Sequence, residues 1–301
     1  KMGFTYVFDR VSGEPVWPIE ERPVDVTTDV PGEVPYPTQP FPTKPPAFSG
    51  QGVSIADAND LTPEIKALAE ETMREFRLGP LYTPPSLRGT LVRPTLSGGA
   101  NWGGASFDPD TGLFYVRTSE GTAVIQVCER NDEDRQDAEW VGGGSVCSDA
   151  RERMRARLGP IPLIKPPYAY LVAIDLNKGE IVWTYRNRQF PFFSSPAVTS
   201  DRVVIGGRDK RVHCLNRKDG KLLWQFRTRG KVDSSPVICD NKVVVGSADG
   251  RLYTLDLADG SELWSYEIGA PIISSPAVVD GKVVIGADDG LVYAFGPEDK
   301  E

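Results

Sequence analysis

Short apolar runs separated by polar turns fill the second half of the chain. In the clearest stretch the runs cover residues 235–238, 242–246, 252–257 and 263–268. Val, Ile, Leu and Tyr dominate these runs, and turn-forming dipeptides such as Asp249-Gly250 lie between them. Glycine favours tight turns because it adopts positive φ at no steric cost. The pattern therefore predicts four short antiparallel strands joined by hairpins.

This four-strand unit recurs along the chain. One motif marks each copy: an Asp or Asn is followed four residues later by a Gly and, after four more, by a Trp. Its copies end at Trp183, Trp224 and Trp264, which lie 41 and 40 residues apart. A fourth copy of the spacing ends at Trp17. A Ser-Ser-Pro triplet keeps the same interval, at residues 194–196, 234–236 and 274–276. Repeated four-stranded units predict the blades of an all-β propeller, which stack because a lone blade cannot bury both faces. A β-solenoid and a pair of sandwiches are the alternatives.

The repeats divide the chain into blocks. We expect residues 1–20 to hold the last strands of an incomplete blade and 21–99 to form a Pro-rich and helical insertion. The remaining blocks are a blade at 100–185 that carries a charged insertion at 121–168, blades at 186–226 and 227–266, and an incomplete final blade at 267–301. This gives four to five four-stranded blades. Within the first insertion, Thr62 can cap a helix that begins at Pro63.

Composition narrows the chemistry. The formal net charge of −8 argues against a nucleic-acid binder, which needs clustered Lys and Arg. No run of about 18 apolar residues predicts a membrane span. The single histidine, His213, occupies the repeat position held by Tyr253 and Tyr293, so we interpret it as a packing residue rather than a catalytic base.

The four cysteines form no C-x-x-C pair, which excludes a zinc finger and a covalently attached haem. Cys128 and Cys147 flank part of the charged insertion, and we expect them to form a disulfide in an oxidising compartment, with free thiols as the alternative. Cys214 and Cys239 lie in apolar runs and are expected to be buried.

A first resemblance rests on the repeat itself. The spacing A-x-D-x-x-x-G-x-x-x-W, met literally from Ala173 to Trp183, resembles the tryptophan-docking motif of quinoprotein propellers. The likeness covers about residues 170–296. It implies a propeller of the quinoprotein type, whose members bind pyrroloquinoline quinone (PQQ) or are non-catalytic relatives.

A second resemblance covers about the first 115 residues. The sequence KMGFTYVFDR at residues 1–10 is similar to the K-x-G-x-x-Y-V-L-D-R stretch of PQQ-dependent sugar and alcohol dehydrogenases. PTQPF at 37–41, YTPPS at 82–86 and GGANWGG at 98–104 follow in order. Together they resemble the membrane-type glucose dehydrogenase branch, whose propeller has eight blades.

That resemblance implies cofactor-binding roles for three residues. Lys1 matches the lysine that contacts the quinone carbonyl oxygens, and Asn101 matches an asparagine that hydrogen-bonds the rim of the cofactor. Trp102 follows at the start of an innermost strand. The alternatives are an ordinary chain terminus for Lys1, a turn contact for Asn101 and a core position for Trp102. In the family the catalytic Asp and the calcium ligands precede the Lys motif, so no catalytic or metal-binding residue is assigned here.

These observations favour the C-terminal portion of a PQQ-dependent dehydrogenase that oxidises an alcohol or a sugar by hydride transfer to the quinone. The resemblance implies PQQ and calcium as cofactors, the calcium being held outside this chain, and a periplasmic location. Expected partners are the small substrate, a quinone pool or an electron-transfer protein, and the missing N-terminal blades. The alternative is a non-catalytic propeller that acts as a binding or assembly scaffold, which the regular repeats of residues 186–296 favour.

Overall fold

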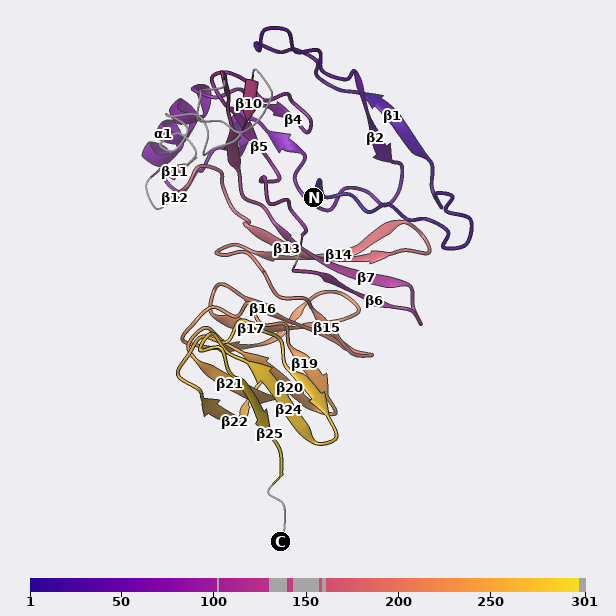
Figure 1. Ribbon diagram of the computed structural model, residues 1–301, viewed down its shortest axis with the longest axis vertical. Coiled ribbons are helices and arrows are strands. Elements are labelled where there is room, and N and C mark those ends of the chain that lie inside the picture. The colour runs from indigo at the N-terminus through magenta and orange to yellow at the C-terminus, as the bar shows by residue number, and fades with distance from the viewer. Residues whose placement is uncertain (102, 130–139, 143–156, 159–160, 298–301) are drawn as a thin grey trace. The chain divides into compact units, whose positions relative to one another are not determined.

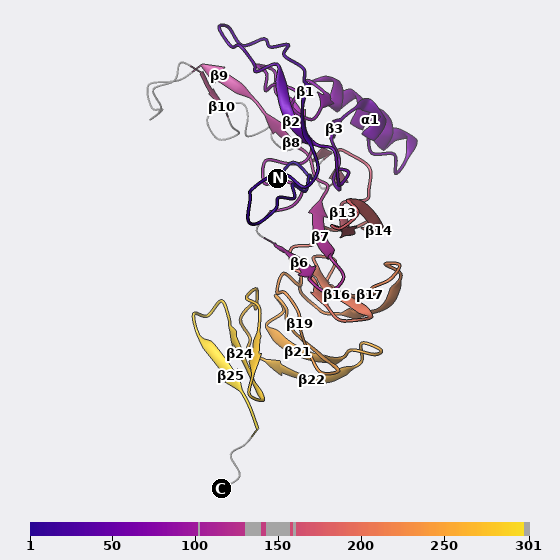
Figure 2. The same cartoon turned by 90° about the vertical axis from the view of Figure 1, so that its right-hand side faces the viewer.

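A computed structural model describes residues 1–101, 103–129, 140–142, 157–158 and 161–297 (Figures 1 and 2). The chain divides into two compact units. The first comprises residues 1–101 and 119–168, and the second comprises 102–118 and 169–301. Strands predominate in both units, which confirms the all-β prediction.

The first unit joins short strand pairs to one helix. Its pairs are β1 (Ile19–Pro23) with β2 (Thr38–Pro42), β3 (Gly52–Val53) with β4 (Gly79–Pro80), β5 (Thr90–Val92) with β8 (Ala123–Ile125), β9 (Val127–Glu129) with β10 (Trp140–Gly142), and β11 (Arg157–Leu158) with β12 (Ile161–Pro162). All five pairs are antiparallel. A 3-10 turn, η1 (Ile55–Asp57), precedes the helix α1 (Pro63–Arg74).

The helix α1 begins where the sequence predicted. The Thr62 hydroxyl accepts a hydrogen bond from the Ile65 amide at 3.2 Å, and Pro63 fills the first turn. Such a cap satisfies one of the amides that a helix start leaves without a carbonyl partner. Ala69 and Met73 are fully buried and anchor the helix in the core of this unit. That core also contains Val53, Phe76, Leu91, Val124, Leu163 and Ile164.

The second unit contains four antiparallel sheets. The first runs β14-β13-β7-β6 and is built from β6 (Ala105–Asp108), β7 (Leu113–Ser119), β13 (Ala169–Asp175) and β14 (Glu180–Asn187). The second runs β15 (Ala197–Val198), β16 (Arg202–Gly207), β17 (Arg211–Asn216) and β18 (Leu222–Arg227). The third runs β19 (Val237–Cys239), β20 (Lys242–Gly246), β21 (Arg251–Asp256) and β22 (Glu262–Glu267). The fourth has three strands, β23 (Ala277–Val279), β24 (Lys282–Gly286) and β25 (Val292–Phe295).

The repeated tryptophans join successive sheets of this unit. The Trp224 indole lies on Gly260, where an added Cβ would sit 2.5 Å from the ring, and its N–H donates to the Leu257 carbonyl at 2.9 Å. Gly260 also has φ +77°, so both its space and its backbone require glycine. Trp183 makes the equivalent contact with Gly220 in the sheet that follows it. The Trp of one repeat therefore packs on the Gly of the next and holds the two sheets together.

The Ser-Ser-Pro triplets form a second link. The Ser194 hydroxyl donates to the Gly206 carbonyl at 3.0 Å and stays within its own repeat. The Ser195 amide instead donates to the hydroxyl of Ser235 in the following repeat at 2.9 Å, and the Ser235 amide donates to Ser275 at 3.1 Å. One serine therefore fixes the loop and the other joins neighbouring repeats. No helix of the described residues is long and apolar enough to span a membrane.

Candidate functional site

The N-terminal residues lie against the loop of residues 95–101, within the first unit. The Gly99 amide donates to the Lys1 carbonyl at 3.0 Å, and an added Cβ on Gly98 would sit 2.9 Å from the Lys1 Cα. Gly98 also has φ +85°. Glycine at this position therefore lets the Lys1 backbone approach the loop, while the exposed Lys1 side chain extends from it.

Asn101 belongs to the same loop. Its side-chain Nδ2 donates to the Ser97 carbonyl at 2.7 Å and closes the loop on itself. No described residue hydrogen-bonds to its Oδ1. The fold thus brings Lys1 and Asn101, 100 positions apart in the sequence, to one loop. Trp102, the third predicted residue, lies outside the described residues.

A buried carboxylate, Glu120, holds the segment that packs against this loop. Glu120 is 2 % exposed, and it accepts hydrogen bonds from the Ser49 hydroxyl at 2.8 Å and the Gly50 amide at 2.9 Å. An added Cβ on Gly99 would sit 2.6 Å from the Ser49 Oγ. Glu120 therefore fixes the segment on which the loop rests. The sequence analysis missed it, although a carboxylate directly after the buried strand β7 is a usable signal, because charged groups are rarely buried without partners.

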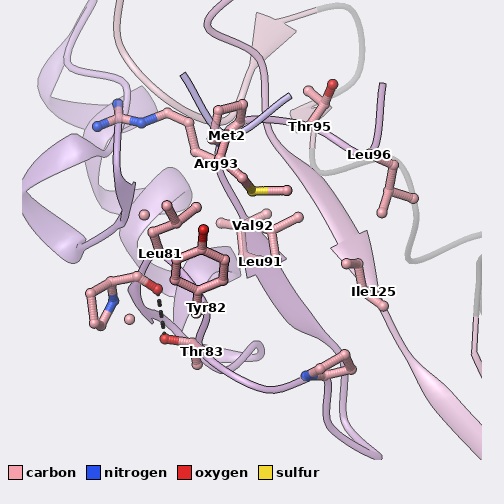
Figure 3. Close-up of a pocket in the computed structure, with 15 residues that line it drawn as sticks. Met2, Leu81, Tyr82, Thr83, Leu91, Val92, Arg93, Thr95, Leu96 and Ile125 are labelled. Atoms are coloured by element: carbon pink, nitrogen blue, oxygen red, sulfur yellow. Dashed lines mark hydrogen bonds between the residues drawn. The ribbon is translucent and has the colours of Figure 1, made fainter. Parts of the chain in front are cut away.

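An apolar pocket of about 200 Å³ opens beside the same loop (Figure 3). Tyr82 lies among the side chains that line it, and its phenol has no hydrogen bond to a described residue. Burial raises the pKa of the Tyr82 phenol, with a smaller contribution from nearby Tyr6. The other large side chains of the lining are Met2, Leu81, Leu91, Val92, Arg93, Leu96 and Ile125.

Comparison with known proteins identifies the family. The sequence profile of the glucose/ethanol/alcohol dehydrogenase β-propeller domain, a PQQ family, matches residues 1–238. The chain belongs to this family. The quinoprotein resemblance and the propeller fold are thereby confirmed.

Several relatives of the chain in this quinoprotein family are named for the substrates that they oxidise. The quinate/shikimate dehydrogenase (quinone) of Acinetobacter baylyi is 28% identical over 259 residues, which is 75% of this chain and 32% of the relative. The quinoprotein glucose dehydrogenase of Escherichia coli is 28% identical over 264 residues, 75% of this chain and 32% of the relative. The glycerol dehydrogenase large subunit of Gluconobacter oxydans is 25% identical over 263 residues, 74% of this chain and 35% of the relative. The chain spans about a third of the length of these relatives.

One solved structure, BamB from Moraxella catarrhalis, aligns with a TM-score of 0.43 at 19% identity over 64% of this chain and 45% of that one.

His213 is a structural residue of its quinoprotein blade. It is 1 % exposed, its Nε2 lies 3.1 Å from Asp209, and its Nδ1 lies 3.0 Å from the Tyr185 hydroxyl. In the next blade the hydroxyl of Tyr253 donates to Asp249 at 3.0 Å with the same four-residue spacing. Burial, followed by the bond to Asp249, raises the pKa of Tyr253. His213 therefore occupies the aromatic position that Tyr253 holds in the next repeat, with its ring against Tyr185 and Phe192.

The metal-site and cysteine predictions can be compared with the described residues. No group of three or more His, Cys, Asp or Glu that could hold a metal ion occurs among the described residues. Cys128 is disulfide-bonded, while Cys147, its expected partner, lies outside the described residues. Cys214 is buried as expected, and Cys239 is only partly buried.

Proposed function

We propose that this chain is the C-terminal portion of a PQQ-dependent dehydrogenase that oxidises an alcohol or a sugar. The proposal rests on family membership together with one observation, the packing of the Lys1 backbone on the glycine-rich loop that also carries Asn101. The relatives that are named for quinate, glycerol and glucose all oxidise a carbon that carries a hydroxyl group.

The residues of the loop fit PQQ. The cofactor carries carboxylates and adjacent carbonyls, and the loop offers it an ammonium group from Lys1 and the side-chain oxygen and amide of Asn101. When bound, PQQ supplies the acceptor for the hydride of the substrate. With PQQ bound, the Lys1 ammonium group would stabilise negative charge that develops on the carbonyl oxygens of the cofactor. Gly98 allows the close approach of Lys1, and the Gly99 amide holds the Lys1 carbonyl.

The rest of the enzyme is part of the same proposal. The calcium ligands and the catalytic base belong to residues outside this chain. The missing N-terminal blades of an eight-bladed propeller likewise lie outside it. The electrons leave to a quinone pool or an electron-transfer protein, and the enzyme works in the periplasm. Trp102 is assigned to the cofactor site with Lys1 and Asn101.

Titration of the protein that contains this chain with PQQ in the presence of calcium tests the proposal. We expect saturable PQQ binding, followed by absorbance, that weakens at least tenfold in Lys1→Ala and is retained in Lys1→Arg. Lys242→Ala, which changes an exposed lysine of β20, is the matched control. Dye reduction with glucose, glycerol or quinate then reports turnover. Equal PQQ affinity in Lys1→Ala and the unmodified protein would contradict the assignment.

The scaffold alternative is favoured by the second unit. There the repeat residues Trp183, Trp224, Ser195 and Ser235 all serve contacts between sheets. Failure of the protein that contains this chain to bind PQQ at any tested concentration would favour this second function.

A further inference from the structure

The pocket beside Tyr82 has the size of a single ring. Its volume of about 200 Å³ compares with the roughly 150 Å³ of an engineered apolar cavity that binds benzene. Pockets for drug-sized, multi-ring ligands occupy about 300–1,000 Å³. A tricyclic cofactor such as PQQ is therefore too large for it, whereas one substituted six-membered ring fits.

The lining of the pocket includes a polar group, the Tyr82 hydroxyl, that makes no hydrogen bond to a described residue, whereas the Thr95 hydroxyl is paired with that of Ser97 at 2.7 Å. Thr83 donates its hydroxyl to the Pro80 carbonyl at 2.8 Å, and the guanidinium of Arg93 turns away from the pocket toward Asp57, 3.4 Å from its carboxylate (Figure 3). The Tyr82 hydroxyl has no such partner among the described residues and points toward Met2 (Figure 3). An apolar ring that carries a hydrogen-bond acceptor is the complement of this lining, because Tyr82 can donate to it.

The backbone of Tyr82 supports a functional interpretation. Its φ is +70°, in the left-handed region that bulky aromatic residues rarely adopt. Such a conformation is strained and persists where the surroundings hold it, often at ligand sites. The edge contact of its ring with Phe41, 5.6 Å between centroids, helps to hold it.

The pocket adjoins the proposed cofactor loop. Met2 lines the pocket and directly follows Lys1, while Thr95 and Leu96 line it and directly precede the segment that ends at Asn101. The same two chain segments therefore form a wall of the pocket and position the two proposed cofactor residues.

We infer that this pocket binds the ring of a benzoquinone-type electron acceptor, with the Tyr82 hydroxyl donating to one of its carbonyl oxygens. The inference rests on the proposed function. Oxidation of a hydroxyl-bearing carbon to a carbonyl releases two electrons and two protons, and a benzoquinone takes up both pairs as it becomes a hydroquinone. Met2, Leu91, Val92 and Ile125 provide the apolar contacts for the ring and its substituents.

Equilibrium dialysis with duroquinone tests the inference in the protein that contains this chain, without PQQ. The ring of duroquinone is fully substituted, so the free thiols Cys214 and Cys239 have no ring hydrogen to replace. The oxygen-free ring p-xylene, followed by NMR, is the matched ligand. We expect both to bind saturably at one site. Tyr82→Phe should weaken duroquinone about tenfold, the value of one hydrogen bond, and leave p-xylene unchanged.

Two further variants locate the site. Val92→Phe fills the pocket and should remove binding of both ligands, whereas Val279→Phe changes an exposed position of β23 and should leave both intact. Tyr6→Phe is the control for Tyr82→Phe, because the Tyr6 hydroxyl donates to the Pro40 carbonyl and Tyr6 is not among the residues that line the pocket. Circular dichroism of each variant confirms folding.

The outcomes separate the two proposals. Duroquinone binding that Tyr82→Phe weakens supports the pocket, even if PQQ fails to bind and the dehydrogenase proposal falls. Undiminished duroquinone binding in a folded Val92→Phe variant, or no saturable binding at all, would overturn the inference and leave the PQQ test unaffected. Equal loss of p-xylene and duroquinone in Tyr82→Phe would also overturn the hydrogen bond assigned to the hydroxyl.

Discussion

The indole N–H of Trp183 donates to the backbone carbonyl of Arg217, in the next repeat, at 2.8 Å. Trp224 repeats this bond to Leu257 at 2.9 Å. Their exposed fractions are 7 % and 8 %, whereas Trp264, the third tryptophan of the series, is 42 % exposed and packs against Tyr266 and Phe295. The same motif residue thus has two environments in one unit.

This difference predicts unequal effects of a conservative change. Trp224→Phe removes the indole N–H and leaves the carbonyl of buried Leu257 without its donor, so we expect a loss of about 1–3 kcal/mol in the free energy of unfolding. Trp264→Phe removes no hydrogen bond to a described residue and should cost under about 0.5 kcal/mol. Urea unfolding followed by circular dichroism measures both. Equal losses would show that the indole bond contributes nothing to sheet stacking.

The turn glycines allow a matched pair of substitutions. Gly260 and Gly281 have φ of +77° and +69°, but an added Cβ would sit 2.5 Å from the Trp224 ring at Gly260 and within 4 Å of nothing at Gly281. Gly281→Ala should therefore cost only the backbone term, about 1–2 kcal/mol. Gly260→Ala adds the displacement of a packed aromatic ring and should cost at least about 1 kcal/mol more. Thermal melts of the two variants, compared at one concentration, give the difference.

Acid should weaken the ion pairs around Asp233. Burial opposes ionisation of this carboxyl, but hydrogen bonds from Arg208, at 2.9 Å, and Lys231, at 3.0 Å, hold its pKa below the ordinary value. Because the folded pKa is the lower one, the carboxylate stabilises the fold above about pH 4 and this contribution is lost as pH falls through the folded pKa.

Asp233→Asn should therefore lower stability at pH 7 and flatten its dependence on pH below about 4. Urea midpoints measured from pH 7 to pH 2 provide the test. Asp280→Asn changes an exposed aspartate at a turn with φ +49° and is the control that should retain the unmodified profile. A parallel pH profile for Asp233→Asn and the unmodified protein would contradict the assignment.

Glu120 makes a prediction for the first unit. Glu120→Gln replaces one accepting oxygen by an NH2 group, which is a donor. The two carboxylate oxygens accept from the Ser49 hydroxyl and the Gly50 amide, so one of these donors loses its acceptor. We expect a loss of about 1–3 kcal/mol and faster hydrogen exchange at Gly50. Glu71→Gln, on the exposed face of α1, is the control. Unchanged exchange at Gly50 would show that the carboxylate does not fix this segment.

The sequence by itself determined the repeated sheets. The spacing from Asp256 through Gly260 to Trp264 encodes a turn, a positive φ and a large ring, and these are local or periodic features that need no knowledge of distant residues. The cap of α1 at Thr62 was predictable for the same reason. The family resemblance also followed from ordered motifs in the sequence and was confirmed by the match over residues 1–238.

Only the tertiary structure decided which distant residues meet. Three contacts join segments that are far apart in the chain: Lys1 packs against Gly98, Glu120 accepts a hydrogen bond from Ser49, and Tyr82 lines an apolar pocket. Such contacts have no period, since each is made once and its partners are brought together by packing of the whole unit. A carboxylate or a tyrosine is ordinary in the sequence, and its chemistry is set by its surroundings in the fold.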